Sequence, residues 1–300
     1  MNLHRLDLFS LSLFVLVARS GSISKGAELA SLAIGAASRR LTDLEAAVGS
    51  ELFDRHSRGV TLTVAGQALQ QHAQRILSDV DRLAADLSDH AAGLVGAVRL
   101  WANTSAVTQF LPGDIASFTG AHPGVRIELE EEDSGAIVLA VLDGRADVGI
   151  FADRTPTLGL HVMRYRDDRL VLVVPSSHEL ARRRSLHFAE AVDEDFVCLS
   201  KNTSLAQRML SETSSIGRSL RIRIQVRSFD AMCRMVAAGL GVAVLPAEAV
   251  RHQLRALQLK QIPLDDAWAQ RHLLIGLRDP NAVPRHVRQL IDHLCEAQKG

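Results

Sequence analysis

The chain has 300 residues, a length sufficient for about two domains and several buried layers of side chains. Hydrophobic residues make up 47% of it and charged residues 23%, which excludes wholesale disorder and collagen-like or low-complexity architectures. Lysine and arginine together number 34, as do aspartate and glutamate, so the net charge is zero and any contact with a polyanion must come from a local patch.

Two features predict a protein of the reducing cytoplasm with no membrane contact. The three cysteines, Cys198, Cys233 and Cys295, are odd in number and far apart, which excludes a disulfide framework. The apolar segment Leu8–Ala18 is only 11 residues long, whereas a membrane span needs about 20. Because no small-residue cleavage site follows it, we predict a buried helix there rather than a signal peptide.

The first 63 residues carry the signals of three helices and two short strands. A first helix ends at Gly21, and Ser24 is expected to cap a short second helix. A third helix is predicted over about residues 33–48. Strand-like pieces at Leu52–Phe53 and Val60–Leu62 flank a turn. This order predicts a helix-turn-helix with a β wing.

The segment from Gln67 to Ala92 contains no helix breaker, and its apolar residues recur in three heptads. The pattern predicts a long helix that forms a coiled-coil seam with a second chain. A helix lying on its own domain is the alternative for a pattern this short. The residues expected in the dimerisation seam are Leu69, Ile76, Val80, Leu83 and Leu87.

After Gly93 and Gly96, apolar strand candidates alternate with helical segments. This alternation predicts parallel sheets with helices on both faces, arranged as two similar α/β lobes. We expect the chain to cross to the second lobe near residues 153–164 and to return near 264–272. The predicted strands are Val98–Ala102, Val125–Leu129, Val148–Phe151, Leu170–Val174, Phe196–Leu199, Ile222–Val226, Val242–Leu245 and Leu273–Leu277, before a last helix at Val283–Ala297.

A collinear series of motifs runs over some 45 N-terminal positions, and further motifs lie in the α/β part. The first series is Gly21-Ser22-Ile23-Ser24, Ala27, Leu32, Ala36-Ala37-Ser38-Arg39-Arg40-Leu41, Leu44-Glu45, Gly49, Leu52-Phe53-Asp54-Arg55, Arg58-Gly59-Val60 and Leu62-Thr63-Val64-Ala65-Gly66. The later motifs are Leu111-Pro112, His122-Pro123-Gly124-Val125, Leu142-Asp143-Gly144-Arg145-Ala146-Asp147-Val148-Gly149-Ile150 and Ala238-Gly239-Leu240-Gly241-Val242-Ala243-Val244-Leu245-Pro246. Together they resemble the LysR-type transcriptional regulators over nearly the whole chain.

The resemblance implies an α/β multidomain protein that regulates transcription in response to a small molecule. It implies an N-terminal winged helix-turn-helix, a long linker helix, and a C-terminal two-lobed α/β effector domain resembling periplasmic binding proteins. The corresponding boundaries are 1–63, 64–92 and 93–300, with lobe I at about 96–160 and 268–300 and lobe II at about 161–267. Double-stranded DNA, a small effector and a second copy of the chain, as a dimer or tetramer, are then the expected partners.

A recognition helix reads bases in the major groove through its N-terminal part. Here the family's usual hydroxyl and glutamine residues are replaced by Ala33-Ile34-Gly35. Ala33 cannot cap the helix by its side chain, and Ile34 offers only an apolar contact such as a thymine methyl. Residues 1–63 contain seven Lys or Arg and six Asp or Glu, so this predicted DNA-binding domain is only weakly basic. The DNA-binding residues that we predict are Ser22, Ile34, Gly35, Ser38, Arg39, Thr42, Arg55 and Arg58, the last two in the wing.

Hydroxyl-rich helix starts follow a strand in each predicted lobe. Thr104 and Ser105 follow the first strand of lobe I, and Thr203 and Ser204 follow a strand of lobe II, with Lys201 just before them. Free N–H groups, hydroxyls and a cation suit an anion. We therefore predict that these five residues bind an effector, a carboxylate-bearing metabolite, between the lobes. Simple helix capping is the alternative for either cluster alone.

The sequence contains no complete enzyme motif, so we expect no catalysis, cofactor or metal. Gly239-Leu240-Gly241 follows a helix and precedes a strand, the reverse of a dinucleotide loop, and His178-Glu179 lacks the second histidine of a zinc protease. No Gly-x-Ser-x-Gly elbow occurs. Two other functions stay open: a ligand-independent regulator, and a small-molecule binding protein that does not use its N-terminal domain for specific DNA binding.

Overall fold

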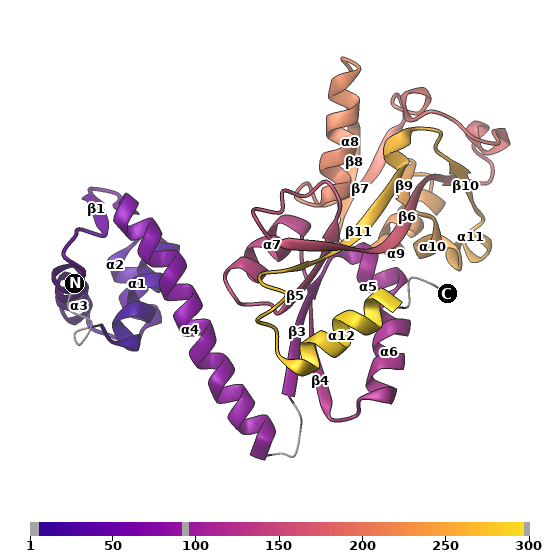
Figure 1. The fold of residues 1–300 in the computed structure, drawn as a ribbon. Coiled ribbons are helices and arrows are strands. Elements are labelled where there is room, and N and C mark those ends of the chain that lie inside the picture. The colour runs from indigo at the N-terminus through magenta and orange to yellow at the C-terminus, as the bar shows by residue number, and fades with distance from the viewer. Residues whose placement is uncertain (1–5, 92–95, 297–300) are drawn as a thin grey trace. The chain divides into compact units, whose positions relative to one another are not determined.

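The computed structural model describes residues 6–91 and 96–296. The chain folds into two compact units, one around the N-terminal helices and one around the α/β sheets. Figure 1 shows each unit with its elements labelled. As the sequence predicts, the alternation of strands and helices begins after the long helix, with a strand at Gly96–Ala102.

The N-terminal domain is a three-helix unit with a two-stranded wing, followed by one long helix. Ser22, and not Ser24 as predicted, caps the second helix, because the chain is extended at Ser22 and its hydroxyl accepts a hydrogen bond from the Lys25 N–H at 3.4 Å. Ser24 therefore lies inside the first turn. The elements are α1 (Leu8–Ser20), α2 (Ile23–Leu29), α3 (Ile34–Val48), β1 (Phe53–His56), β2 (Gly59–Leu62) and α4 (Val64–Ala91).

The core of this domain forms where apolar faces of the three helices meet the wing and the start of α4. A close approach joins the wing to the turn after α1: the Val60 N–H donates to the Gly21 carbonyl at 3.0 Å. A side chain at Gly59, where φ is 141°, would place its Cβ 2.3 Å from that same carbonyl. The helix-turn-helix and the wing are consequently held as one rigid unit. Its core residues are Leu11, Leu13, Phe14, Val15, Val17, Ala27, Ala37, Leu41, Leu44, Leu52, Phe53, Val60 and Ala73.

Lobe I is a mixed sheet with helices on both faces. The strand β3 pairs parallel with β4 and β5, whereas β11 pairs antiparallel with β5. The helices α6 and α12 cover one face of the sheet, and α7 covers the other (Figure 1). The elements are β3 (Gly96–Ala102), α5 (Thr104–Gln109), α6 (Leu111–Ala121), β4 (Val125–Glu131), α7 (Ser134–Leu142), β5 (Val148–Ala152), β11 (Gln270–Leu277) and α12 (Arg285–Glu296).

Lobe II has one large apolar core around a second mixed sheet. The strands β7 and β8 are parallel, and a bridge from Phe196 to Val242 joins β7 to the region of β9. The elements are η2 (Glu179–Arg182), η3 (Phe188–Glu190), β7 (Asp195–Leu199), α8 (Ser204–Ser215), β8 (Arg221–Val226), α9 (Phe229–Ala237), β9 (Ala243–Pro246), α10 (Ala247–Val250), α11 (Gln253–Ala256), β10 (Leu259–Pro263) and η4 (Ala267–Ala269).

One long strand, β6 (His161–Pro175), belongs to both lobes. Its first part pairs antiparallel with β11, and its second part, from Leu170 on, pairs antiparallel with β9 and β10. The sequence predicts the crossing near residues 153–164 and parallel sheets, whereas the chain passes between the lobes at about Leu170 and β6 pairs antiparallel with β9, β10 and β11. The crossing lies inside β6, whose first part is largely exposed and carries charged residues, so it lacks an apolar strand signal.

Candidate functional site

One face of α3 is open to solvent and rich in groups that can touch another molecule. Ile34 is 56% exposed at its first turn. Gly35, Arg39 and Thr42 are exposed too, and Ser38 is half-buried. The Thr42 hydroxyl donates to the Ser38 carbonyl at 3.1 Å. The predicted residues of this helix thus share one accessible surface.

Arg39 and its neighbour Arg40 have different surroundings. Arg40 donates to the Asp7 carboxylate at 3.2 Å and to the Ser10 hydroxyl at 3.0 Å, and its guanidinium lies 4.8 Å from the Phe9 ring centroid. Arg40 therefore ties α3 to the start of α1. Within the described residues, Arg39 has no recorded ion pair or hydrogen bond through its side chain, so its guanidinium is available to a partner.

The start of α3 lacks a side-chain cap. Ala33 stands at the cap position, and no side-chain hydrogen bond closes the first turn, as its methyl group dictates. The N–H groups of that turn are therefore left for water or for a ligand oxygen. The partial positive charge of a helix start favours an anion such as a phosphate there.

The two wing arginines also differ. Arg55 lies 3.6 Å from Glu45, whose carboxylate in addition accepts hydrogen bonds from the Leu52 and Phe53 N–H groups at 2.9 and 3.3 Å. Arg58 is exposed in the turn between β1 and β2, and no side-chain partner is recorded for it among residues 6–91 and 96–296. Arg55 is thus partly engaged in the fold, whereas Arg58 is not.

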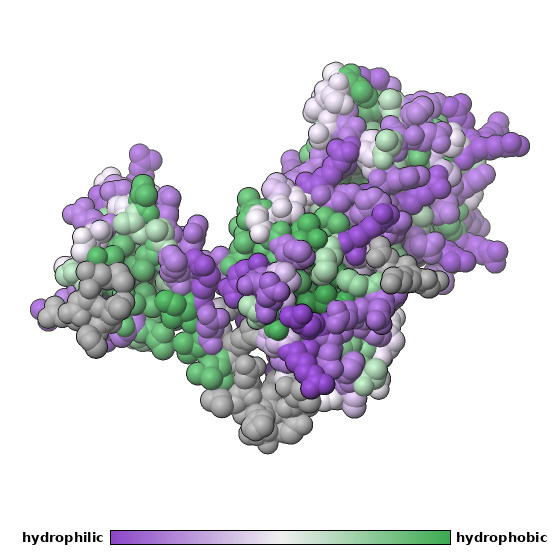
Figure 2. Space-filling model, in the orientation of Figure 1, coloured by the Kyte–Doolittle hydropathy of each residue, from purple (hydrophilic) through white to green (hydrophobic). Residues whose placement is uncertain are grey.

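The predicted seam on α4 divides into two parts. Leu69 and Ala73 pack against the core of the N-terminal domain, as in the alternative of a helix lying on its own domain. Farther along, Ile76, Val80 and Leu83 are 41%, 38% and 58% exposed. Figure 2 shows hydrophobic surface along the described part of this helix. The side chain of Leu87 lies outside the described residues.

The hydroxyl clusters of the two lobes do come together. Thr104, Ser105, Thr203 and Ser204 all line one small cavity of about 20 Å³ between lobes I and II. The Ser204 hydroxyl lies 3.5 Å from that of Ser134 across the cleft. Lys201 is exposed on the preceding turn and is not among the residues that line this cavity.

Most of these hydroxyls already have partners. Thr104 donates to Glu131 at 2.6 Å, and Asn103, not Thr104, caps α5. Thr203 caps α8 by accepting from the Ala206 N–H at 3.3 Å. This cavity, of about 20 Å³, is moreover much smaller than the neighbouring cavity of about 580 Å³. An organic molecule therefore requires the larger neighbouring cavity.

That larger cavity, of about 580 Å³, lies in the same interlobe cleft and shares Asp133, Ser134, Ser204 and Arg271 with the small one. Sequence reasoning missed most of it, because its walls come from several segments that carry no local motif. The lining residues are Asp133, Ser134, Gly135, Ala136, Leu139, Ala152, Asp153, Arg154, Thr155, Pro156, Leu170, Asn202, Ser204, Gln207, Arg208, Trp268, Gln270 and Arg271.

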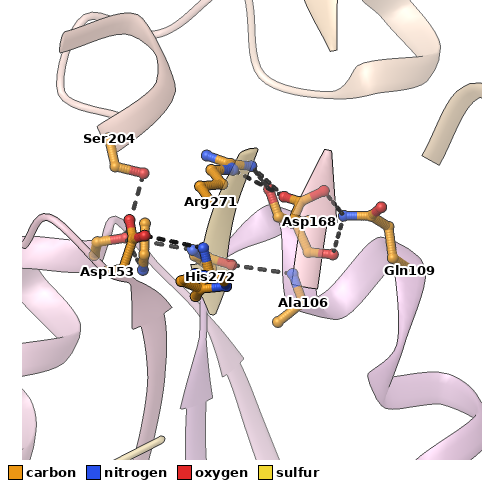
Figure 3. A network of polar contacts seen from close by, with 11 residues as sticks. Ala106, Gln109, Asp153, Asp168, Ser204, Arg271 and His272 are labelled. Carbon is orange, nitrogen blue, oxygen red and sulfur yellow. Dashed lines mark hydrogen bonds and ion pairs between the residues drawn. The ribbon is translucent and has the colours of Figure 1, made fainter. Parts of the chain in front are cut away.

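A buried ion pair joins the two crossing strands at the floor of the cleft. Arg271 of β11 donates to the Asp168 carboxylate of β6 at 2.6 and 2.9 Å, and to the Ser105 hydroxyl at 2.7 Å. The side chains of Arg271 and Asp168 are 9% and 1% exposed. Figure 3 shows one guanidinium nitrogen of Arg271 pointing away from Asp168. Arg271 thus links both crossing strands and α5 to the two cavities.

Two other kinds of site are absent from residues 6–91 and 96–296. No helix there is both long and apolar enough to cross a membrane. No group of three or more histidine, cysteine, aspartate or glutamate residues in those ranges could hold a metal ion. The candidate sites are therefore the exposed face of α3 with the neighbouring wing, and the interlobe cleft.

Comparisons with known proteins cover nearly the whole chain. A family model described as the LysR substrate binding domain matches residues 91–299, and one described as the bacterial regulatory helix-turn-helix protein of the lysR family matches residues 8–67. The HTH-type transcriptional regulator BenM of Acinetobacter baylyi is 28% identical over 278 residues, which cover 91% of this chain and 90% of BenM.

Two solved structures extend the comparison to the fold. Full-length CbnR complexed with target DNA is similar with a TM-score of 0.65 and 18% identity, and the match covers 98% of this chain and 100% of that one. The effector-binding domain of QuiR in complex with shikimate is similar with a TM-score of 0.60 and 16% identity, covering 68% of this chain and 97% of that domain. At these identities the likeness shows a shared fold.

Proposed function

The chain belongs to the LysR family of bacterial transcriptional regulators, and on that basis we propose a role for each of its parts. Residues 1–63 bind a specific DNA sequence, residues 64–92 join two chains, and residues 93–300 bind a small effector. The protein works in the cytoplasm and catalyses no reaction. The cavity of about 580 Å³ between the two lobes is the observation that favours an effector-responsive regulator.

The DNA contacts divide between base readout and backbone binding. Arg39, Ser38 and Thr42 face the bases of the major groove, and Ile34 offers an apolar contact suited to a thymine methyl. Gly35 lets the DNA approach the helix closely, since no atom lies within 4 Å of where its Cβ would be. Three further predicted residues, Ser22, Arg55 and Arg58, contact the phosphate backbone or the minor groove. CbnR, which shares the fold, has been solved in complex with its target DNA.

Two chains pair through α4, which brings two DNA-binding domains to one operator. The exposed residues Ile76, Val80 and Leu83 continue the heptad pattern beyond the part of the helix that packs on its own domain. Exposed apolar residues at this spacing are stabilised by a second copy of the helix. The dimer, or a tetramer of two such dimers, is the species expected to bind DNA.

The effector binds between the lobes and changes the population of lobe arrangements. The hydroxyl cluster of Thr104, Ser105, Thr203 and Ser204 forms the narrow end of this site, with Lys201 on the adjoining turn. The larger cavity holds the body of the molecule. QuiR, which shares the fold, holds shikimate in its effector-binding domain. By the same chemistry we propose a small carboxylate-bearing effector here.

A thermal-shift screen of the full-length protein against a metabolite collection tests the effector role. Binding to the native state alone raises the melting temperature with ligand concentration. We expect at least one compound to do so and to change the affinity for an operator duplex. Stabilisation without any effect on DNA would favour a binding protein that does not use its N-terminal domain. Specific DNA binding with no responding compound would favour the ligand-independent regulator.

A further inference from the structure

We propose that the effector is a zwitterion, an α-amino acid with an apolar side chain, whose carboxylate is bound by Arg208 and Arg154 and whose ammonium group is bound by Asp133. The proposal rests on the proposed function, because it takes the cavity between the lobes as the effector site. It adds the chemical class of the ligand and assigns roles to Arg154, Arg208 and Asp133.

The apolar part of the cavity suits a hydrophobic side chain. Leu139 of α7 lines it and is 49% exposed, and Pro156, Leu170 and Trp268 contribute further apolar surface. A volume of about 580 Å³ is within the range of pockets for small organic molecules, about 300–1,000 Å³. Covering Leu139 by a ligand side chain removes apolar surface from water, which favours binding.

Two neighbouring arginines that line the cavity have donor groups to spare. The Nε of Arg208 is buried and has no hydrogen-bond partner within the described residues. Its Nη2 lies 2.5 Å from Glu212, and its guanidinium lies 5.7 Å from the Trp268 ring centroid. Arg154 is exposed beside it, and no ion pair of Arg154 is recorded in the described ranges. A ligand carboxylate can satisfy donors on both side chains.

The surroundings of Arg208 favour an added anion. Burial has the largest effect on the pKa of its guanidinium and lowers it, and the nearby Arg154 lowers it further. The charges of Glu212 and Asp153 and the hydrogen bond to Glu212 act in the opposite direction. A poorly solvated cation next to a second cation is stabilised when an anion binds between them. The unpaired Nε also means that one buried donor gains an acceptor when the ligand arrives.

An acid without a cationic partner lines the same cavity. Asp133, just before α7, has no recorded side-chain hydrogen bond or ion pair among residues 6–91 and 96–296. Burial raises the pKa of this carboxyl group, and the neighbouring Glu132 charge raises it further. A ligand ammonium group beside Asp133 would offset both effects and stabilise the ionised carboxylate.

The mixture of charges disfavours a ligand of one sign. A simple carboxylic acid would bring its negative charge into a cavity that Asp133 and Asp153 also line. A simple amine would meet the arginines instead. Opposite charges attract and like charges repel over a few ångströms in a partly desolvated site. A molecule with one group of each sign can therefore form a favourable charge interaction through each group.

Calorimetry of the full-length protein with matched compounds tests this directly. The probes are L-leucine and L-phenylalanine, their deaminated partners 4-methylpentanoate and 3-phenylpropanoate, and their decarboxylated partners isopentylamine and phenethylamine. We expect at least one amino acid to bind about tenfold or more tightly than either of its partners, the effect of one lost charge-assisted hydrogen bond. The proposal is overturned if neither amino acid binds, or if a deaminated partner binds equally well.

Two variants test which residues contact the ligand's ammonium and carboxylate groups, and two further variants serve as controls. Asp133→Asn should reduce binding of the amino acid but not of its deaminated partner, and Arg208→Gln should reduce binding of both. Glu130→Gln removes an equal charge nearby without lining the cavity, and Arg234→Gln removes an arginine from a similar i,i+4 helix pair elsewhere. Both controls should bind like the parent.

The outcomes separate this inference from the function on which it rests. Tight binding of an acid without an amine, lost in Arg208→Gln but unchanged in Asp133→Asn, would overturn the zwitterion and leave an effector-binding regulator. Unchanged binding of the amino acid in both Asp133→Asn and Arg208→Gln would place it outside this cavity and overturn the inference as well. Failure of the chain to select any DNA sequence would instead contradict the regulator itself. Melting temperatures of the unliganded variants show that each one folds.

Discussion

Arg39 and Arg40 are adjacent and chemically identical, yet the fold gives them opposite roles. Arg40 is held by Asp7, which is 33 residues away in the sequence, while Arg39 stays open on α3. Helical spacing placed both on a polar face, and only the tertiary contact distinguishes them. The wing repeats the division, since Arg55 lies next to Glu45 and Arg58 does not.

Arg39→Ala should weaken specific DNA binding by about 1–3 kcal/mol, if Arg39 makes a bidentate contact with a guanine, and should relax base preference at one position. Arg58→Ala should lower affinity with less change in preference, because a wing contact to the backbone or minor groove reads little sequence. Fluorescence anisotropy with operator variants at one fixed salt concentration measures both effects.

Arg184→Ala serves as the control for these two variants, since it removes the same charge from an exposed site in lobe II. If all three variants bind the operator and its mutants like the parent chain, the exposed face of α3 and the wing tip are not the DNA contacts.

The Arg271–Asp168 pair is the best-buried charge pair that the described ranges record, and breaking it should be costly. Asp168→Asn leaves a buried guanidinium without its counter-charge, so the free energy of unfolding should fall by about 3–5 kcal/mol. Urea unfolding followed by tryptophan fluorescence reports on this domain alone, because both tryptophans, Trp101 and Trp268, lie in it.

Asp230→Asn provides the comparison for that experiment. The Asp230–Arg234 pair is exposed on α9, so its loss should change stability little. Equal effects of the two substitutions would show that burial of the Arg271–Asp168 pair does not determine its contribution.

At the scale of elements, most helices and strands could be predicted from local patterns to within a few residues, whereas contacts between distant segments could not. The helix starts at Thr104 and Ser204 follow their strands as expected, because capping chemistry is a property of a few adjacent residues. The cavity lined by Asp133, Arg208 and Trp268 brings together residues from distant parts of the chain. The sequence around any one of these residues does not predict that the other two lie close to it.

The strand β6 illustrates the same limit. Its apolar second part, from Leu170, was predicted, but the part from His161 to Arg169 is largely exposed and charged. That part becomes a strand because it pairs with β11, which lies about a hundred residues later in the sequence. The tertiary partner thus decided the conformation where local propensity did not.

The α4 seam makes a prediction about assembly. Ile76→Glu combined with Leu83→Glu would bury two charges between paired helices, and such a dimer should dissociate. Light scattering should then give the mass of one chain, and affinity for an operator with two half-sites should collapse. Gln67→Glu combined with Gln71→Glu adds the same charge at exposed positions of α4 and should leave the oligomer intact. An unchanged oligomer in the first variant would show that these residues do not form the seam.

At the scale of the whole molecule, effector and DNA binding must influence each other equally. If an effector changes the affinity for the operator by some factor, typically about 5–150-fold, then DNA changes the affinity for the effector by the same factor. Anisotropy titrations with and without effector, and calorimetry with and without operator, measure the two ratios. If neither affinity changes when the other ligand is present, the lobes bind a ligand without controlling DNA binding.

Selection of DNA from a pool of random duplexes by the purified full-length chain tests the central claim most directly. A dimeric regulator should enrich a common motif with two related half-sites, spaced by about one helical turn or a multiple of it. The Arg39→Ala variant should enrich that motif weakly or lose one of its positions. A selected pool indistinguishable from the starting pool, at a salt concentration that suppresses non-specific binding, would contradict the account.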